Sequence, residues 1–245
     1  MFRFHCFGKT DRGRVRSKNE DALLLRPELG LLAVADGMGG GEGGELASRI
    51  FTETALEVFA GPSAGSEEEC RRSMQKAFAL ANERILREAR KKQFSKMGCT
   101  ADLVAFCPPG YVLGHVGDSR TYLLRKGQLR QLTRDHSLVQ QQVDEGLLSP
   151  EEAKKHPMRN IILRAVGVDE TLAVDLIKGR GQSGDLLLLC SDGLTGMVED
   201  GDIENLLLHA MSLEQKVDRL IEAANSAGGA DNVSVILCEV AGPSS

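Results

Sequence analysis

Three short apolar runs of this chain each meet an aspartate. Asp36 follows the first run, Asp192 follows the second and Asp231 precedes the third; the runs cover 31–35, 186–191 and 233–238. Apolar runs of this length, bounded by Gly, Asp and Asn, are typical of buried strands. Neighbouring antiparallel strands end and begin at one sheet edge, so the three aspartates are expected to converge. Converging carboxylates repel one another and are tolerated mainly around cations, which predicts a hard-metal site.

A bland interpretation exists for any single member of this pattern. Asp-Gly pairs such as Asp36-Gly37 also form ordinary hairpin turns. A further aspartate, Asp118, follows the run 114–117 in the same manner. Repetition behind several apolar runs favours the metal site over a set of unrelated turns.

Composition limits the class of protein. The chain has 245 residues, 42% hydrophobic and 27% charged, which suits one large globular domain. A net charge of -5 gives no support for a nucleic-acid or polybasic membrane surface. No apolar stretch approaches the roughly 20 residues that span a bilayer, and no secretory signal is recognisable at residues 1–6. We therefore expect a cytoplasmic protein that binds neither nucleic acid nor membrane.

The six cysteines contain no Cys-x-x-Cys pair. Cys99, Cys107, Cys190 and Cys238 lie in or beside apolar runs, where a free thiol behaves as a small hydrophobe. Buried, structural thiols are expected at these four positions.

The pattern of elements that must position the aspartates is antiparallel. Strands are expected over 2–7, 22–25, 31–35, 99–107, 111–116, 121–124, 128–132, 161–166, 172–177, 186–190 and 233–240. Helices are expected over 45–59, 66–92, 202–209 and 213–224, and a polar, partly helical stretch over 137–156. Ser66, followed by three glutamates, is a good helix start. Strict strand–helix alternation is absent, so stacked antiparallel sheets with helices outside are favoured over a parallel sheet.

One rival motif lies between a strand and a helix. Gly39 to Gly44 satisfies the G-x-G-x-x-G pattern of dinucleotide-binding dehydrogenases, with Glu53 and Glu57 downstream. Asp36 at the strand tip would repel a pyrophosphate, and the chain lacks the expected alternation. The pattern is also weak within a run so rich in glycine.

Five motifs appear in a fixed order along the chain. They are Arg16-Ser17-Lys18-Asn19-Glu20-Asp21, Asp36-Gly37-Met38-Gly39-Gly40, Gly117-Asp118-Ser119-Arg120, Ser191-Asp192-Gly193 and Asp231-Asn232. With 99–101 and 133–137 between them, they resemble the metal-dependent serine/threonine protein phosphatases, the type 2C family, in its compact bacterial form. The resemblance extends from Thr10 to Val240.

The resemblance implies an α+β fold, a four-layer α-β-β-α sandwich with two central antiparallel sheets flanked by helices. It implies one catalytic domain over 1–245. A flap-like insertion at about 137–164 is expected beside the active site, where it would influence substrate choice.

The resemblance also implies a metal centre with two Mn²⁺ or Mg²⁺ ions and, in bacterial members, a weaker third. Asp36 would bridge both ions, Asp192 and Asp231 would complete one site, and the Gly37 carbonyl would help form the other. The implied ligands are Glu20 or Asp21, Asp36, Gly37, Asp118 (third ion), Asp192 and Asp231. The sequence leaves open whether Glu20 or Asp21 ligates the second ion directly or through water.

Such a centre suits phosphate ester hydrolysis. Unaided hydrolysis is very slow because the charged phosphoryl group repels an anionic nucleophile. Two divalent ions about 3.5–4 Å apart can hold a bridging hydroxide and neutralise developing charge. All-oxygen ligands favour Mg²⁺ or Mn²⁺ over zinc or copper.

Arg16 is the best candidate to bind the substrate phosphate, because a guanidinium matches two phosphate oxygens at once. Its basic neighbours, Arg12, Arg14 and Lys18, are expected to be solvated. Arg120 is expected to form a structural ion pair.

The general acid is unassigned, because Met38 occupies the position where many eukaryotic relatives have histidine. Metal-bound water, on the ion associated with Asp118, is the preferred hypothesis. His115, His136 and His156 are weaker candidates.

These observations predict a phosphatase that hydrolyses phosphoserine and phosphothreonine in proteins. A water bridging two metal ions would attack in line, with no covalent phosphoenzyme. Its partners would be phosphorylated substrates of a serine/threonine kinase, and a monomer is expected. Two alternatives stay open: a phosphatase of another phosphomonoester, and an inactive phosphoprotein-binding module, in which loss of a metal aspartate would be expected.

Overall fold

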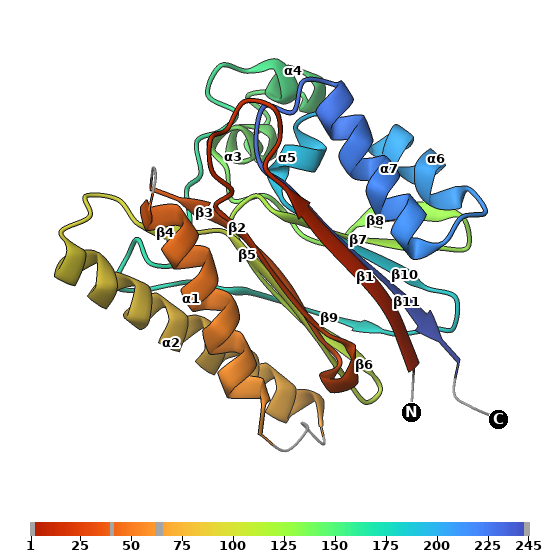
Figure 1. The fold of residues 1–245 in the computed structure, drawn as a ribbon, viewed down its shortest axis with the longest axis horizontal. Coiled ribbons are helices and arrows are strands. Elements are labelled where there is room, and N and C mark those ends of the chain that lie inside the picture. The colour runs from red at the N-terminus through yellow and green to blue at the C-terminus, as the bar shows by residue number, and fades with distance from the viewer. Residues whose placement is uncertain (1–2, 40–41, 62–65, 243–245) are drawn as a thin grey trace.

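The first and last strands of the chain lie side by side in one sheet. The computed structural model describes residues 3–39, 42–61 and 66–242. The sheet has the order β1 (Arg3–Asp11), β11 (Val233–Ala241), β10 (Leu186–Cys190), β7 (Arg120–Arg125) and β8 (Gln128–Gln131). Figure 1 shows β1 as its near edge. Segments from both ends of the sequence therefore meet where this sheet ends.

The second sheet is stacked on the first. Its order is β2 (Asp21–Arg26), β3 (Leu31–Met38), β5 (Ala101–Cys107), β6 (Gly110–Val116) and β9 (Asp175–Arg180), and β4 (Gly98–Cys99) pairs with the end of β3. A one-turn 3-10 helix, Pro27–Leu29, joins β2 to β3. Every strand pair in the described chain is antiparallel, so the doubly wound parallel sheet of the dehydrogenase rival is wrong.

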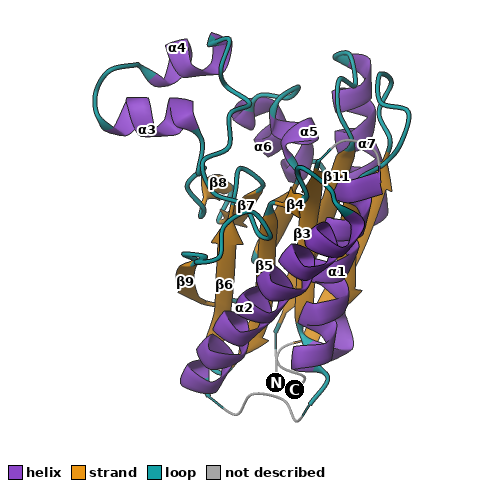
Figure 2. Cartoon of the chain, turned by 90° about the vertical axis from the view of Figure 1, so that its left-hand side faces the viewer, coloured by secondary structure: helices purple, strands orange, loops and turns teal. Residues whose placement is uncertain are grey.

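Helices cover the outer face of each sheet. On one side α1 (Glu42–Phe59) and α2 (Glu67–Lys92) pack on the second sheet, as Figure 2 shows. On the other, α5 (Asp192–Thr195), α6 (Asp200–Leu208) and α7 (Leu213–Ser226) pack on the first sheet. The expected α+β fold, a four-layer α-β-β-α sandwich, is confirmed. None of the described helices is long and apolar enough to cross a membrane.

Apolar side chains fill the three interfaces between these layers. Between the two sheets the core includes Leu32, Val34, Val104, Leu113, Leu187, Leu189 and Ile236. Strands with apolar residues on both faces result, because each sheet is covered by helices on one side and by the other sheet on the opposite side. This double burial explains the uninterrupted apolar runs that end at the aspartates.

Most expected elements are present with small shifts. The second helix spans 67–92 with Ser66 as its N-cap, where the Ser66 hydroxyl accepts from the Glu69 N–H at 3.2 Å. The expected helix 45–59 begins earlier, at Glu42, and the expected strand 99–107 is interrupted at Thr100. Expectations that touch residues 2, 40–41 and 62–65 lie outside the described residues.

The predicted strand over 161–166 is wrong. Only two isolated bridges occur there, Ser137 with Ile162 and Cys99 with Val166. Ile161 and Leu163 are exposed rather than packed in a sheet, so apolar character alone misled the assignment. The strand expected over 172–177 lies later, as β9 (Asp175–Arg180).

Residues 137–164 form the segment that was expected to be a flap. It contains α3 (Leu138–Asp144) and α4 (Pro150–Lys155), with N-caps at Ser137 and Ser149. Figure 2 shows both helices standing beyond the ends of the sheets. The segment returns to the sandwich near His136, whose carbonyl accepts from the Leu163 N–H at 2.7 Å.

Candidate metal centre

Asp36 and Asp21 lie opposite each other on neighbouring strands. The register of β2 and β3 pairs them directly, so their side chains share one face of the sheet. The Ser191 hydroxyl donates to Asp21 Oδ2 at 2.8 Å, whereas the buried Asp21 Oδ1 has no hydrogen-bond partner among the described residues. Burial raises the pKa of Asp21 to about 7, despite hydrogen bonds from Ser191 and Ser234 that lower it.

Asp192 reaches the same place from the first sheet. It begins α5 immediately after β10, and its backbone carbonyl accepts from the Gly196 N–H at 2.6 Å. Burial and the Asp231 charge raise the pKa of Asp192, while a hydrogen bond from Asp36 opposes them. Asp192 Oδ1 is buried with no hydrogen-bond partner in the described part of the chain. Asp36 and Asp192, far apart in sequence, are therefore in contact.

Asp231 lies at the more exposed side of the cluster. Its Oδ2 accepts from Arg16 Nη2 at 2.6 Å, and its Oδ1 accepts from the Asn232 N–H at 2.8 Å. A Cβ at Gly13 would collide with the Asp231 carbonyl, and the φ of Gly13 is +79°. Glycine thus allows the β1–β2 loop to lie directly on the Asp231 backbone.

Asn232 holds that loop in place through three hydrogen bonds. Its Nδ2 donates to the carbonyls of Arg12 and Lys18, both at 2.9 Å, and its Oδ1 accepts from the Glu20 N–H at 2.8 Å. Asn232 therefore positions the segment that carries Arg16, a role the sequence motif did not reveal. Only tertiary structure brings these partners together, across more than 200 residues of sequence.

Asp118 enters the cluster from the turn between β6 and β7. It follows Gly117, whose φ of +110° and close approach to Thr100 exclude other side chains. Burial, followed by the Asp192 charge, raises the pKa of Asp118 well above its usual range. Its Oδ1 is buried with no partner in the residues described.

Thr100 connects this turn to Asp36. The Asp36 N–H donates to Thr100 Oγ1 at 3.3 Å, and the Thr100 N–H donates to the Asp36 carbonyl at 2.9 Å. Thr100 Oγ1 also lies 2.6 Å from the hydroxyl of Ser119. Thr100 and Ser119 thereby fix the backbone of Asp36 relative to the Asp118 turn.

Gly37 lies where three backbone segments meet. Its N–H donates to the Glu20 carbonyl at 3.2 Å, and a Cβ would collide with the Gly44 carbonyl in the first turn of α1. A Cβ at Gly44 would in turn collide with the Glu20 carboxylate. The Glu20 carboxylate therefore lies at the start of α1, beside Gly37, whereas Asp21 lies opposite Asp36 on the neighbouring strand.

The cluster as a whole carries more negative charge than its surroundings neutralise. Burial raises the pKa of Asp36 well above its usual range, and Asp21, Asp192, Asp118 and Asp231 raise it further, in that order. Arg16, more than half exposed, contributes the positive charge that the structure places beside Asp231. Repelling carboxylates with unpartnered oxygens fit hard divalent cations, which accept all-oxygen ligands.

The side chains of the described residues do not by themselves supply all the ligands of a metal ion. No group of three or more His, Cys, Asp or Glu side chains has the arrangement of a complete metal site within the described residues. Mg²⁺ and Mn²⁺ sites commonly use few carboxylates together with waters and backbone carbonyls. An incomplete set of side-chain ligands therefore agrees with this donor chemistry.

Two of the three candidate histidines, His115 and His136, are held in structural contacts, and His156 lies at the end of α4, where its Nδ1 accepts from the Met158 N–H at 3.2 Å. His115 is fully buried, with Nδ1 2.6 Å from Asp102 Oδ1 and Nε2 2.9 Å from the Arg134 carbonyl. His136 accepts from the Gly117 N–H at 3.0 Å through Nδ1, and burial lowers its pKa to about 4. Arg120, as expected, forms a structural ion pair, with Asp135 at 2.7 Å.

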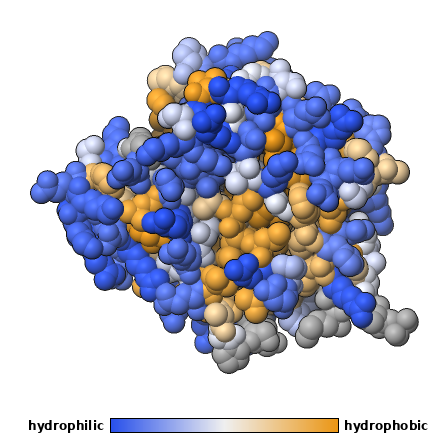
Figure 3. Space-filling view, viewed as in Figure 1, coloured by the Kyte–Doolittle hydropathy of each residue, from blue (hydrophilic) through white to orange (hydrophobic). Residues whose placement is uncertain are grey.

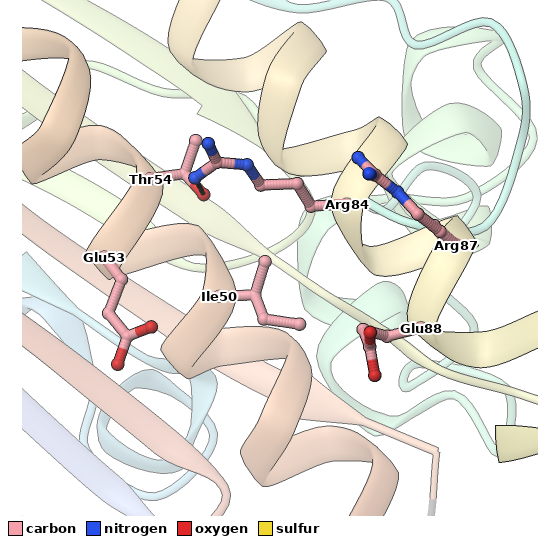
Figure 4. Close-up of a pocket in the computed structure, with 6 residues that line it drawn as sticks. All are labelled: Ile50, Glu53, Thr54, Arg84, Arg87 and Glu88. Atoms are coloured by element: carbon pink, nitrogen blue, oxygen red, sulfur yellow. Dashed lines mark hydrogen bonds between the residues drawn. The ribbon is translucent and has the colours of Figure 1, made fainter. Parts of the chain in front are cut away.

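A hollow of about 610 Å³ begins beside the metal centre at Met38 and Gly39. It is bounded by the end of α2, the residues 93–98 and the segment 162–169, which begins within the stretch 137–164. A second hollow lies between α1 and α2, and Figure 4 shows Arg84 reaching across it toward Thr54. Arg84 is engaged there with Thr54 and Glu57, so that hollow holds a structural ion pair.

Comparison with known proteins gives one consistent result. Residues 11–238 match the family model described as protein phosphatase 2C. The chain is 39% identical over 240 residues to the serine/threonine phosphatase stp of Listeria innocua, covering 96% of this chain and 95% of the relative. A crystal structure of the Mycobacterium tuberculosis serine/threonine phosphatase PstP/Ppp is 35% identical, with a TM-score of 0.92 over 99% of this chain and 100% of that one. The catalytic domain of PstP in complex with two manganese ions is 34% identical, with a TM-score of 0.90 over the same shares.

Stacked antiparallel sheets that end in a cluster of buried carboxylates, three of them with an unpartnered oxygen, agree with a metal-dependent hydrolase. The chain belongs to the protein phosphatase 2C family. It is a protein serine/threonine phosphatase that depends on Mn²⁺ or Mg²⁺.

Proposed function

We propose that the carboxylate cluster binds two Mn²⁺ or Mg²⁺ ions, and that phosphoserine and phosphothreonine side chains of proteins are hydrolysed beside them. The observation that carries this proposal is the set of buried, unpartnered oxygens of Asp21, Asp118 and Asp192 within the described chain. Leaving such oxygens unsatisfied is costly, and a hard cation removes that cost. The manganese complex of a relative supports the choice of metal.

Asp36 is the best candidate for a shared ligand, because four other aspartates influence its pKa. Asp192 and Asp231 would complete one site, and the Gly37 carbonyl would contribute to the other. Asp21 faces the cluster and is preferred over Glu20 as a ligand of the second ion. Asp118 would hold a third ion through its unpartnered oxygen.

The residues of this chain would bind and orient the phosphate. Two bound ions supply neutralising charge and an activated water for in-line attack, without a covalent intermediate. Arg16 is half-exposed and hydrogen-bonded to Asp231 through one guanidinium nitrogen, so its remaining donors can bind phosphate oxygens. Asn232 keeps Arg16 in reach by fixing the loop at Arg12 and Lys18.

The residue directly after the first Asp-Gly pair would not protonate the leaving alkoxide, because Met38 carries no titratable group. The Nδ1 of His115 is closed off by Asp102, and the lowered pKa of His136 keeps that ring neutral near pH 7. Both histidines are therefore poor acids for this step. A proton from ordered water is more consistent with this arrangement.

We also propose a single catalytic domain over 1–245, in which residues 137–164 influence substrate choice. The names of the relatives support phosphoproteins as substrates. With such substrates, the protein would reverse the phosphorylation that a serine/threonine kinase introduces, in a bacterial signalling role. The cytoplasmic location and the monomeric state stay predictions.

The test is hydrolysis of p-nitrophenyl phosphate and of a phosphothreonine peptide by the purified protein with Mn²⁺, Mg²⁺ or chelator. Asp192→Asn should abolish metal-dependent turnover of both substrates, while Asp202→Asn, an exposed aspartate in α6, should match the unaltered protein. Turnover of the small ester without the peptide would favour another phosphomonoester. If the folded protein hydrolyses neither substrate with Mn²⁺ or with Mg²⁺, a phosphoprotein-binding role is supported and the proposal is refuted.

A further inference from the structure

Two cysteines face each other across the first and last strands. The register of β1 and β11 pairs Cys6 directly with Cys238. Their sulfur atoms are 2.7 Å apart. Even non-bonded carbon atoms rest at about 3.5–4.0 Å, whereas a disulfide bond measures about 2.05 Å. The two free thiols are therefore in direct contact.

The backbone geometry of this pair suits a cross-strand link. Ser234 and Val240 direct their backbone groups toward the β10 side: the Ser191 N–H donates to the Ser234 carbonyl, and the Val240 N–H donates to the Asp185 carbonyl. Cys238 has the same parity along β11, so its backbone also faces β10 rather than β1. Cys6 and Cys238 consequently form a non-hydrogen-bonded antiparallel pair, with Cα atoms about 4.5 Å apart and side chains close together. That spacing lies within the range of disulfides.

Access favours oxidation at this pair. Cys6 is partly exposed, whereas the other five cysteines are buried. Cys6, like Phe4 and Leu23, is partly buried and packs against the core between the two sheets, and Figure 3 shows apolar surface gathered over the edge between β1 and β2. A small neutral oxidant can therefore reach Cys6 before the buried thiols.

We propose that Cys6 and Cys238 are a site of oxidative modification, at which a peroxide converts the two thiols to a disulfide between the first and last strands. Cys6 sulfur attacks one peroxide oxygen; the O–O bond breaks, water leaves and a sulfenic acid forms. Cys238 sulfur then attacks the sulfenic sulfur, and the S–O bond breaks. The released oxygen takes the Cys238 proton and leaves as a second water, so two thiols and one hydrogen peroxide give one disulfide and two waters.

The link would act on the strand that leads to the metal centre. β1 is an edge strand, and it continues at Asp11 into the loop that carries Arg16. Edge strands open more readily than central ones. A covalent link at Cys6 would restrain this opening and close a loop between residues 232 positions apart. The oxidised protein should therefore keep its fold and its phosphatase site at higher temperature.

The competing pair is Cys70 with Cys107, from α2 and β5. Their thiols also influence each other, and both are buried. Raised thiol pKa values do not distinguish the two pairs, since Cys238 also has one, but neither Cys70 nor Cys107 is exposed to an oxidant as Cys6 is. Cys70→Ala is therefore the matched control, and Cys6→Ser is the variant that removes the proposed link with the least change to the core.

The experiment treats the reduced full-length chain with hydrogen peroxide, counts free thiols after denaturation and maps the joined peptides by mass spectrometry. Two of the six thiols should be lost, in one peptide joining Cys6 to Cys238. The midpoint of thermal unfolding should rise by about 5 °C or more and return on reduction. Cys70→Ala should behave identically, and Cys6→Ser should show neither the joined peptide nor the shift. Peptides that carry Cys6 and Cys238 oxidised separately, or a Cys70–Cys107 link instead, would overturn the proposal.

Discussion

Two groups of buried aspartates in this protein differ in whether their carboxylate oxygens have hydrogen-bond partners. Asp102, a buried residue of β5, has both carboxylate oxygens hydrogen-bonded: Oδ1 with His115 at 2.6 Å and Oδ2 with the Thr121 hydroxyl at 2.5 Å. Asp185 is equally satisfied, by two nitrogens of Arg125, each at 2.7 Å, and by the Gln182 N–H. Three carboxylates of the metal centre, those of Asp21, Asp118 and Asp192, instead each retain a buried oxygen that no described residue satisfies.

The difference separates structural from functional burial. A carboxylate whose partners are built into the protein stabilises the fold, and removing a partner leaves a costly buried charge. A carboxylate whose oxygens are left open destabilises the metal-free fold, and a cation must compensate. Burial of an acid alone therefore does not identify a site in this molecule, whereas burial without partners does.

The largest effect should come from exchanging a metal-centre acid. Asp36→Asn removes the carboxylate that all four other aspartates of the cluster surround. Its kcat/KM should therefore fall by about a thousandfold or more, the equivalent of several kcal/mol of lost charge stabilisation. The metal-free protein should be as stable as the unaltered chain or more so, because a repelling charge is gone. Steady-state kinetics with Mn²⁺ and urea unfolding in chelator measure the two effects. A large loss of stability in chelator would contradict the comparison.

The reverse outcome is expected at the structural pair. Asp102→Ala leaves His115 buried without its carboxylate partner, which should lower the free energy of unfolding by about 3–5 kcal/mol. The fraction of protein that remains folded should keep its metal-dependent turnover, since the hydrogen-bond partners of Asp102 are His115 and Thr121, which lie outside the carboxylate cluster. Urea unfolding and kinetics corrected for folded protein measure both. If turnover per folded molecule fell as far as in Asp36→Asn, the structural aspartates and the metal-centre aspartates would not differ in function.

The elements of the fold and the convergence of the aspartates could be predicted from local sequence, whereas the contrast between partnered and unpartnered carboxylates could not. The convergence of Asp36 and Asp192 followed from apolar runs that end in aspartate, because strand ends meet at a sheet edge. The helix at 67–92 followed from Ser66 and the acidic first turn. Both signals are local in the sequence, and the structure agrees with both.

The supporting residues required tertiary structure. Asn232 and Thr100 act by binding backbone groups from distant segments, and no local pattern encodes such partners. His115 was a candidate acid on residue type alone, until the structure placed it against Asp102 inside the core. The error at 161–166 has a related cause, since apolar side chains there lie on an exposed segment rather than in a sheet.

A pH titration of the metal-free protein sharpens the comparison further. Burial raises the pKa of Asp21 to about 7 from 3.8, and the pKa values of Asp36, Asp118 and Asp192 are also raised. At these four carboxyls the folded chain binds more protons than the unfolded chain, so their contribution to the free energy of unfolding should fall as pH rises from about 4 to about 7. His136, whose pKa burial lowers from 6.5 to about 4, acts in the opposite direction, so the comparison with a cluster variant isolates the carboxyl part. Urea unfolding in chelator at several pH values measures the slope. Asp192→Asn should flatten it, and an unchanged slope in that variant would place the titrating groups elsewhere.

The smallest effect should come from Arg16, at the edge of the cluster. Arg16→Ala removes a charged hydrogen-bond donor from the phosphate, which corresponds to about 1.5–3 kcal/mol, or roughly a ten- to hundredfold loss in kcat/KM. Arg16→Lys keeps the charge but not the two-pronged geometry, so it should recover only part of that loss. Arg14→Ala, in the same loop, is the control and should stay near the unaltered value. Binding of Mn²⁺, followed by calorimetry, should change little in all three variants, because a loss of metal binding would show that Arg16 acts through Asp231 rather than on the phosphate.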